Sequence, residues 1–178
     1  TVIDRSLARL AYIDSMYLGR IKTLASTYGA IDREVKAADL VIGAVLVHGA
    51  KAPKLVTNEQ VKGMKPGAVL VDIAIDQGGC FETSRPTTHA DPTFLVDGVV
   101  HYCVANMPGA VARTSTFALT NATFPFVEML ANRGVLNALS VDHHLRNGLS
   151  VHKGVLTSEP VAQAQKLDFV LAQELLAA

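Results

Sequence analysis

The segment from Ala68 to Gly79 reads AVLVDIAIDQGG, and it decides the fold that the sequence predicts. Residues 68–75 are apolar apart from Asp72, as in a strand that is buried on both faces of a parallel sheet. Ligands of such sheets lie beyond the carboxyl ends of the strands. Asp76 is therefore expected at the ligand edge, where the glycines that follow permit positive φ and a close approach of the backbone.

Short apolar runs alternate with helical patterns on both sides of this segment. Further strands are expected at residues 1–4, 21–24, 39–46, 94–96 and 100–104, and helices at residues 5–16, 31–38 and 58–64. Thr57 is expected to cap the last of these helices, and Asp97-Gly98 to form the turn of a hairpin. Repeated strand–helix–strand units of this length predict an α/β fold with a parallel sheet.

The pattern changes after Pro108-Gly109. Residues 113–147 contain no strand candidate; a long helix is expected at residues 115–133 with a kink at Pro125, and a second helix at residues 135–146. A short extended piece at residues 152–156 and a helix from about Pro160 follow. We therefore expect one domain at residues 1–110 and a helical segment at residues 111–178.

The composition excludes some classes of protein and partner. Of 178 residues, 49% are hydrophobic and 18% are charged, which is typical of a folded domain. Sixteen basic residues balance sixteen acidic ones, so no nucleic-acid partner is expected. No apolar run approaches the ~20 residues that span a membrane, and no signal peptide is visible. We expect a cytoplasmic protein whose two cysteines are reduced.

No metal site is expected, because the two cysteines match no ligand spacing. The adjacent His143 and His144 point in different directions on a helix, without a ligand at the i+4 position. A solvated helix face explains them better.

The first residues resemble the second half of a strand that ends at Asp4. An acidic residue at the end of the second strand of a dinucleotide-binding fold hydrogen-bonds the adenosine ribose; a surface aspartate after a strand is the plainer interpretation. The sequence contains no G-x-G-x-x-G turn for the cofactor phosphates. Since it also lacks an initiator methionine, we expect it to be part of a longer chain, about half of it.

Two further strand ends carry candidate ligand groups. Residues 43–46 end an apolar run and lead into a polar loop at residues 48–54, where small residues would let the backbone approach a flat ring. Asn106 offers an amide to a carboxamide or a carboxylate, and Met107 an apolar wall. A tight strand exit and a proline-terminated loop explain the two segments about as well.

Several motifs together resemble those of the bacterial NAD-dependent alanine dehydrogenases. They are DLVIGAVLV at residues 39–47, AKAPKLV at 50–56, MKPGAVLVDIAIDQGGCFE at 64–82, SRPTT at 84–88 and YCVANMP at 102–108. TSTFALTNAT at residues 114–123 and GLS at 148–150 continue the match. The resemblance covers nearly the whole chain and is weakest at its C-terminal end.

The resemblance implies a partial Rossmann-type NAD-binding domain, without its first strand and glycine loop, followed by helices of a substrate domain. It implies a homohexamer, and a catalytic-site carboxylate at Asp76 that also contacts the cofactor. Asp4 would bind the adenosine ribose, with Arg9 and Ser26 near the adenine. The other cofactor-binding residues that it implies are Val45, Leu46, Ile73, Ala74, Ile75, Val104, Asn106 and Met107.

The implied reaction converts L-alanine, NAD and water reversibly to pyruvate, NADH and ammonium. In this family the residues that bind the substrate carboxylate and the acid/base histidine come from the other half of the protein, so the isolated chain is expected to be inactive. One alternative is the NAD-binding component of a proton-translocating transhydrogenase, whose form of the motif lacks an acid at position 76. Another is a non-catalytic nucleotide-binding module.

Overall fold

The computed structural model describes residues 1–47 and 51–177, and these residues form two compact units. The first, called the sheet unit below, contains residues 1–46 and 52–105. The second, called the helical unit, contains the described part of residues 47–51 and residues from 106 onward. The first three residues of the polar loop predicted at residues 48–54 lie outside the described residues.

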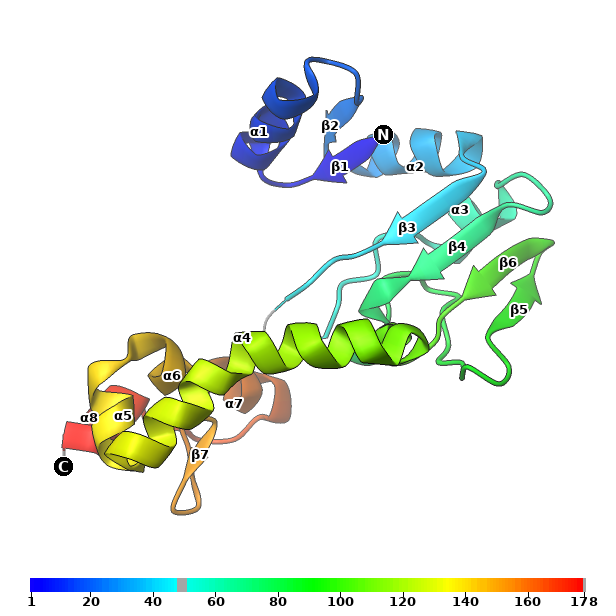
Figure 1. The fold of residues 1–178 in the computed structure, drawn as a ribbon. Helices are drawn as coiled ribbons and strands as arrows, with labels where there is room; N and C mark the ends of the chain where they lie inside the picture. The colour runs from blue at the N-terminus through cyan, green and yellow to red at the C-terminus, as the bar shows by residue number, and fades with distance from the viewer. Residues whose placement is uncertain (48–50, 178) are drawn as a thin grey trace. The chain divides into compact units, whose positions relative to one another are not determined.

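The sheet unit contains two sheets (Figure 1). Strands β1 (Val2–Asp4) and β2 (Thr23–Ala25) form a parallel pair. The second sheet has the order β3-β4-β6-β5 and consists of β3 (Leu40–Gly43), β4 (Val69–Asp72), β5 (Thr93–Val96) and β6 (Val99–Tyr102). The α/β class is confirmed, but the larger sheet is mixed, because β5 pairs antiparallel with β6 through a tight hairpin.

The division into two sheets follows from the expected strand order. In a Rossmann sheet of order 3-2-1-4-5-6, the first strand lies between the second and the fourth. Without that strand between them, the second and third strands pair with each other, and the fourth, fifth and sixth form a separate group. This is the pairing seen for β1-β2 and for β3-β4-β6.

Each helix of the sheet unit begins at a hydroxyl side chain. Helices α1 (Leu7–Tyr17), α2 (Tyr28–Ala37) and α3 (Asn58–Lys62) have Ser6, Thr27 and Thr57 as N-caps. Thr57 accepts a hydrogen bond from the backbone of Gln60, whose side chain accepts one from the Thr57 backbone in return. This capping box satisfies N–H groups that have no partner inside the helix, and it confirms the N-cap predicted at Thr57.

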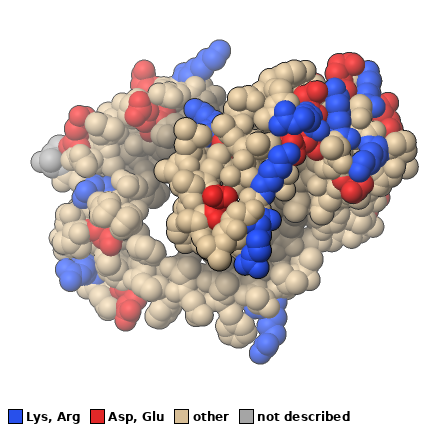
Figure 2. Space-filling view, turned by 90° about the horizontal axis from the view of Figure 1, so that it is seen from above, with Lys and Arg blue, Asp and Glu red and all other residues tan. Residues whose placement is uncertain are grey.

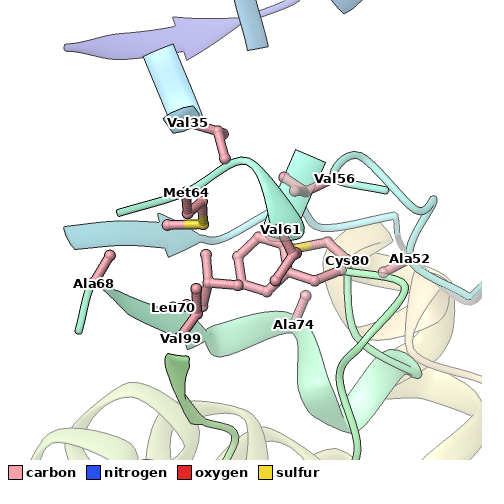
Figure 3. Close-up of a cluster of buried hydrophobic side chains, with 11 residues drawn as sticks. Val35, Ala52, Val56, Val61, Met64, Ala68, Leu70, Ala74, Cys80 and Val99 are labelled. Atoms are coloured by element: carbon pink, nitrogen blue, oxygen red, sulfur yellow. The ribbon is translucent and has the colours of Figure 1, made fainter. Parts of the chain in front are cut away.

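The core of the sheet unit lies between the sheet and helices α2 and α3 (Figure 3). Leu70 of β4 and Val99 of β6 are fully buried and lie near Val61 of α3. Removing such side chains from water is the main stabilising contribution to the fold. The cluster is Val35, Ala52, Val56, Val61, Met64, Ala68, Leu70, Ala74, Cys80, Phe81 and Val99.

Two strands are shorter than the sequence indicates. The strand expected at residues 68–75 ends at Asp72, and the 3₁₀ turn η1 (Ile73–Gln77) follows it. An apolar run such as residues 39–46 is typical of a strand that is buried on both faces. The strand is only β3, and Leu40 and Ile42 on one of its faces are more than half exposed. Val41 lies on the other face and packs against the core cluster. The hairpin turn at Asp97-Gly98 is confirmed, with positive φ at both residues.

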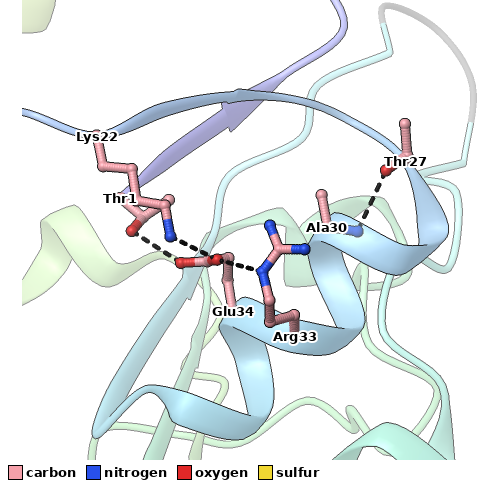
Figure 4. Close-up of polar contacts among 6 residues, drawn as sticks. All are labelled: Thr1, Lys22, Thr27, Ala30, Arg33 and Glu34. Atoms are coloured by element: carbon pink, nitrogen blue, oxygen red, sulfur yellow. Dashed lines mark hydrogen bonds and ion pairs between the residues drawn. The ribbon is translucent and has the colours of Figure 1, made fainter.

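Glu34 of α2 ties that helix to the smaller sheet (Figure 4). Its carboxylate accepts hydrogen bonds from Thr1 Oγ1 at 3.1 Å, Lys22 Nζ at 2.7 Å and Arg33 Nε at 3.0 Å. These donors, above all Lys22, lower the pKa of Glu34 to about 2. Residues that precede β1 and β2, together with one from α2, therefore meet at one carboxylate.

The helical unit begins with η2 (Met107–Val111) and the long helix α4 (Ala112–Arg133), which contains Pro125 and ends at Gly134 with positive φ. The single helix expected at residues 135–146 is two helices, α5 (Val135–Val141) and α6 (His143–Asn147). Asp142 separates them because its carboxylate caps α6 by accepting from the Leu145 backbone at 2.7 Å. The hairpin β7 (Val151–His152) and β8 (Val155–Leu156), helix α7 (Glu159–Gln165) and helix α8 (Ala172–Ala177) complete the unit.

Basic and acidic side chains are intermingled in the upper right of the face that Figure 2 draws. This agrees with the formal net charge of zero. Among the described residues, no helix combines the length and hydropathy that crossing a membrane requires.

Candidate functional site

A pocket of about 360 Å³ lies beyond the carboxyl ends of β3 and β4. Parallel strands end at the same edge of their sheet, so the segments that follow them meet there. One wall comes from residues 44–46 after β3, and the other from η1 after β4. The lining residues are Ala44, Val45, Leu46, Ile73, Ala74, Asp76 and Gln77.

The structure brings together five of the residues that the sequence singled out: Val45, Leu46, Ile73, Ala74 and Asp76. Ala44, from the candidate segment at residues 43–46, and Gln77, which was not predicted, also line it. Ile75 is buried and does not line the pocket, because the turn of η1 directs neighbouring side chains differently. The apolar side chains of Val45, Leu46 and Ile73 provide surfaces against which a flat ring could lie.

Two polar groups in the pocket have hydrogen-bonding capacity available. Asp76 lies in η1 and is exposed, so its carboxylate can accept hydrogen bonds from a ligand without loss of a structural role. The Oε1 atom of Gln77 is buried and has no hydrogen-bond partner among the described residues. A buried acceptor without a partner is energetically costly.

Asp72 lies behind this pocket wall and is fully buried at the end of β4. Its Oδ2 accepts from Ser84 Oγ at 2.6 Å and from the backbone of Cys80 at 2.9 Å and of Phe81 at 3.4 Å. The carboxylate thus fixes the chain that returns after η1. Sequence reasoning missed this residue, although a single acid in an otherwise apolar strand was a visible signal.

The two cysteines near Asp72 are not suited to act as nucleophiles. Burial, and then the negative charge of Asp72, raise the pKa of Cys80 to about 12. Burial also raises the pKa of Cys103 above its ordinary value. Both thiols are buried and unpaired, so both are neutral and shielded at ordinary pH.

A second group of predicted residues lies at the carboxyl ends of β1 and β2. Asp4 ends β1, and its Oδ1 accepts a hydrogen bond from the Ser6 backbone at 2.7 Å. Ser26 follows β2 directly, and its backbone N–H donates to the Asp4 carbonyl at 2.9 Å. Arg9 lies in the first turn of α1, with its guanidinium over the Tyr12 ring. Asp4 and Ser26 are therefore neighbours at the surface of the sheet unit.

The last three predicted residues are divided between the units. Val104 belongs to the sheet unit and is fully buried beside Thr87, with which it forms a bridge. Asn106 has a left-handed backbone with φ of 56°, and Met107 begins η2; both belong to the helical unit. That these three residues contact a cofactor remains a prediction.

Comparison with known proteins shows one family. The alanine dehydrogenase/PNT C-terminal domain family matches residues 1–159. The chain is 61% identical over 176 residues to alanine dehydrogenase of Halomonas elongata, covering 99% of this chain and 47% of that protein. It is 59% identical over 177 residues to alanine dehydrogenase of Mycolicibacterium smegmatis, covering 99% of this chain and 48% of that protein. The chain thus spans about half the length of the curated relatives it matches.

Solved structures agree with this match. An L-alanine dehydrogenase superimposes with a TM-score of 0.80 and 48% sequence identity, over 92% of this chain and 45% of that one. A transhydrogenase from Sinorhizobium meliloti superimposes with a TM-score of 0.67 and 23% identity, over 88% of this chain and 41% of that one. The second likeness concerns the fold alone.

Proposed function

The chain belongs to the alanine dehydrogenase/PNT C-terminal domain family, and from this we propose that it supplies the NAD-binding part of an enzyme for the reversible oxidative deamination of L-alanine. The observation that carries the proposal is the position of Asp76. An exposed carboxylate lies in a pocket with apolar walls at the carboxyl ends of two parallel strands. Nucleotides bind at this edge in open α/β sheets.

The groups in the pocket fit the nicotinamide riboside end of NAD. Val45, Leu46 and Ile73 would contact the faces of the ring, and Asp76 would accept hydrogen bonds from ribose hydroxyls. Gln77 also lines the pocket, and its side chain would lie near the carboxamide. At the other end, Asp4 would accept hydrogen bonds from the adenosine ribose, with Arg9 and Ser26 near the adenine. A carboxylate at Asp4 also repels a 2′-phosphate, which favours NAD over NADP.

In the proposed reaction L-alanine, NAD⁺ and water give pyruvate, ammonium, NADH and a proton. The cofactor supplies the acceptor for hydride. The role of this chain is to orient that acceptor and to place the negative charge of Asp76 beside the nitrogen of the substrate, which becomes a cationic iminium group during oxidation. A fixed charge aimed at developing charge stabilises the transition state more than the ground state.

Asp76→Asn in the intact protein tests this role. The change keeps the size of the side chain and removes its charge, so kcat for alanine oxidation should fall about 100-fold or more. Asp39→Asn is the matched control, because Asp39 precedes β3 at the opposite edge of the sheet and its side chain is 88% exposed. Turnover of Asp76→Asn within a few-fold of the control would refute the proposed role.

The transhydrogenase component remains the alternative, since the family includes both kinds of protein. Oxidation of L-alanine by the intact protein distinguishes the two, because that component has no small-molecule substrate of this kind. Binding of NAD without any hydride transfer would instead indicate a non-catalytic module.

We further propose that residues 111–178 return to the substrate domain, that Val104, Asn106 and Met107 border the nicotinamide, and that the intact protein is a cytoplasmic homo-oligomer, by resemblance a hexamer. The mass of the intact protein and of its assembly in solution, measured by light scattering, tests the last statement.

A further inference from the structure

Lys54 makes an unusual set of contacts that the proposed function does not use. Its ammonium Nζ donates hydrogen bonds to the backbone carbonyls of Gly78 at 2.7 Å, Gly79 at 2.9 Å and Phe81 at 3.1 Å. A lysine ammonium has three donors, and here all three are directed to one short segment. Hydrogen bonds from a charged donor are stronger than those between neutral groups.

The same segment, residues 78–81, is held from its other side by Asp72. That carboxylate accepts from the backbone N–H groups of Cys80 and Phe81, while Lys54 donates to three carbonyls of the same segment. A cation and an anion thus hold the two polar sides of one stretch of backbone. Such an arrangement fixes the position of the segment without any regular secondary structure.

Neighbours of Lys54 add to this attachment. The backbone N–H of Ala52 donates to Gln77 O at 2.9 Å, and that of Leu55 donates to Cys80 O at 2.7 Å. Val56 forms a parallel bridge with Phe81. The connection between β3 and α3 therefore provides one wall of the pocket at residues 44–46 and holds the opposite wall at residues 52–56.

Asp76 and Gln77 immediately precede the segment that Lys54 holds. Asp76 itself has an exposed side chain, so the geometry of its backbone depends on the anchoring of η1 at both ends. The N-terminal end is anchored by β4, and the C-terminal end by Asp72 and Lys54.

We infer that Lys54 is a positioning residue, which sets the location of Asp76 and Gln77 in the pocket through the backbone of residues 78–81. This inference rests on the proposed function of Asp76. It predicts that loss of the ammonium slows the chemical step while the binding of the adenosine end of NAD is retained.

The test compares Lys54→Met with wild type in the intact protein, with Lys65→Met as control. Methionine keeps most of the aliphatic stem and removes the charge. Lys65 pairs with Asp39 at the opposite edge of the sheet. Lys65→Met therefore removes the same charge at a position away from the pocket. We expect kcat for alanine oxidation to fall about 10- to 100-fold in Lys54→Met, since small misplacements of a reacting group cost this much. The Kd for NADH should change less than about threefold, and Lys65→Met should leave both unchanged.

A double-mutant cycle distinguishes positioning from general damage. If Lys54 acts through Asp76, adding Lys54→Met to Asp76→Asn should lower the single-turnover rate by less than about twofold. An equal loss in both backgrounds would overturn the inference and leave the role of Asp76 intact. If Asp76→Asn is itself harmless, the proposed function fails instead.

A third measurement needs no activity. Cys80 lies within the held segment and is fully buried, so its thiol should resist maleimide. Labelling of Cys80, followed by mass spectrometry well below the melting temperature, should be at least about tenfold faster in Lys54→Met if the segment opens locally. Lys54→Arg keeps a charged donor, so its rate of Cys80 labelling and its kcat should lie between those of wild type and Lys54→Met. Unchanged labelling in Lys54→Met, or an arginine variant no better than methionine, would contradict the inference.

Discussion

Two carboxylates in the sheet unit gather several hydrogen-bond donors, and they do so in opposite environments. Asp72 is fully buried at the end of β4 and binds backbone and hydroxyl donors from residues 80–84. Glu34 is only partly buried, with 16% of its side chain exposed, and it binds Lys22 and Arg33, whose side chains are 54% and 62% exposed. No water can replace a lost partner of the fully buried Asp72, whereas the partners of Glu34 are in contact with water.

The comparison teaches which polar contacts decide local structure. The buried donors around Asp72 have no water to bind instead, so the carboxylate determines the path of the chain beside the candidate pocket. Around Glu34, the exposed Lys22 and Arg33 side chains can exchange their partner for water or salt ions, so these contacts add little to the free energy of unfolding. Three predictions test this difference, from the largest expected effect to the smallest.

Asp72→Ala should lower the free energy of unfolding by about 3 kcal/mol, because buried N–H and O–H donors lose their acceptor. Ser84→Ala removes one donor of the same network and should cost about 1 kcal/mol. Urea unfolding of both variants measures the difference. Equal losses would show that Asp72 is no more than one hydrogen-bond partner among several, and the contrast with Glu34 would then disappear.

Gly79→Ala should destabilise by about 2 kcal/mol, and Gly78→Ala by about 1 kcal/mol. Both glycines have positive φ, so both variants carry backbone strain. Only at Gly79 would a Cβ also collide, at 2.7 Å from Asp72 Oδ2 and 2.9 Å from Ser84 Cβ, while Gly78 faces open space. The difference between the two variants therefore measures the effect of tight packing around Asp72. Equal decreases in the melting temperature would show that this packing contributes nothing.

Glu34→Gln should lower the melting temperature only slightly, and the loss should vanish in about 1 M salt, where exposed ion pairs are screened. The folded-state pKa of Glu34 is about 2, below its ordinary value of 4.5. A depressed carboxyl pKa stabilises the fold above the unfolded value, and this contribution disappears as the pH falls from 4.5 towards 2. Melting curves of wild type and variant should converge over that range; a gap that persists at pH 2 and in high salt would mean that Glu34 behaves like a buried group.

Much of the fold followed from local patterns. The cap at Thr57, the turn at Asp97-Gly98 and the end of α4 at Gly134 all depend on residues close in sequence, and the structure contains each of them. Two predictions failed where local patterns were insufficient. Apolar spacing did not reveal that Asp142 would cap a new helix, nor that β4 would end four residues before Asp76.

The candidate site shows the same division. Residues at strand ends were predicted from the rule that parallel strands expose their carboxyl ends on one side, and five of them line the pocket. Gln77 was not predicted as a site residue, although it lies between Asp76 and the two glycines. Asp72 and Lys54 were missed because their partners lie 8 to 27 residues away along the chain.

The sequence by itself determined the α/β class, the boundaries of most elements and the family motifs, because periodicity, caps and turns act over a few residues. Only the tertiary structure decided which polar side chains became structural. Asp72 and Asp76 are both acids near the end of β4, yet one is buried among donors and the other is exposed in the pocket. The path of residues 52–56 and 78–84 makes this distinction, since it brings distant donors to Asp72 and leaves Asp76 exposed for a ligand.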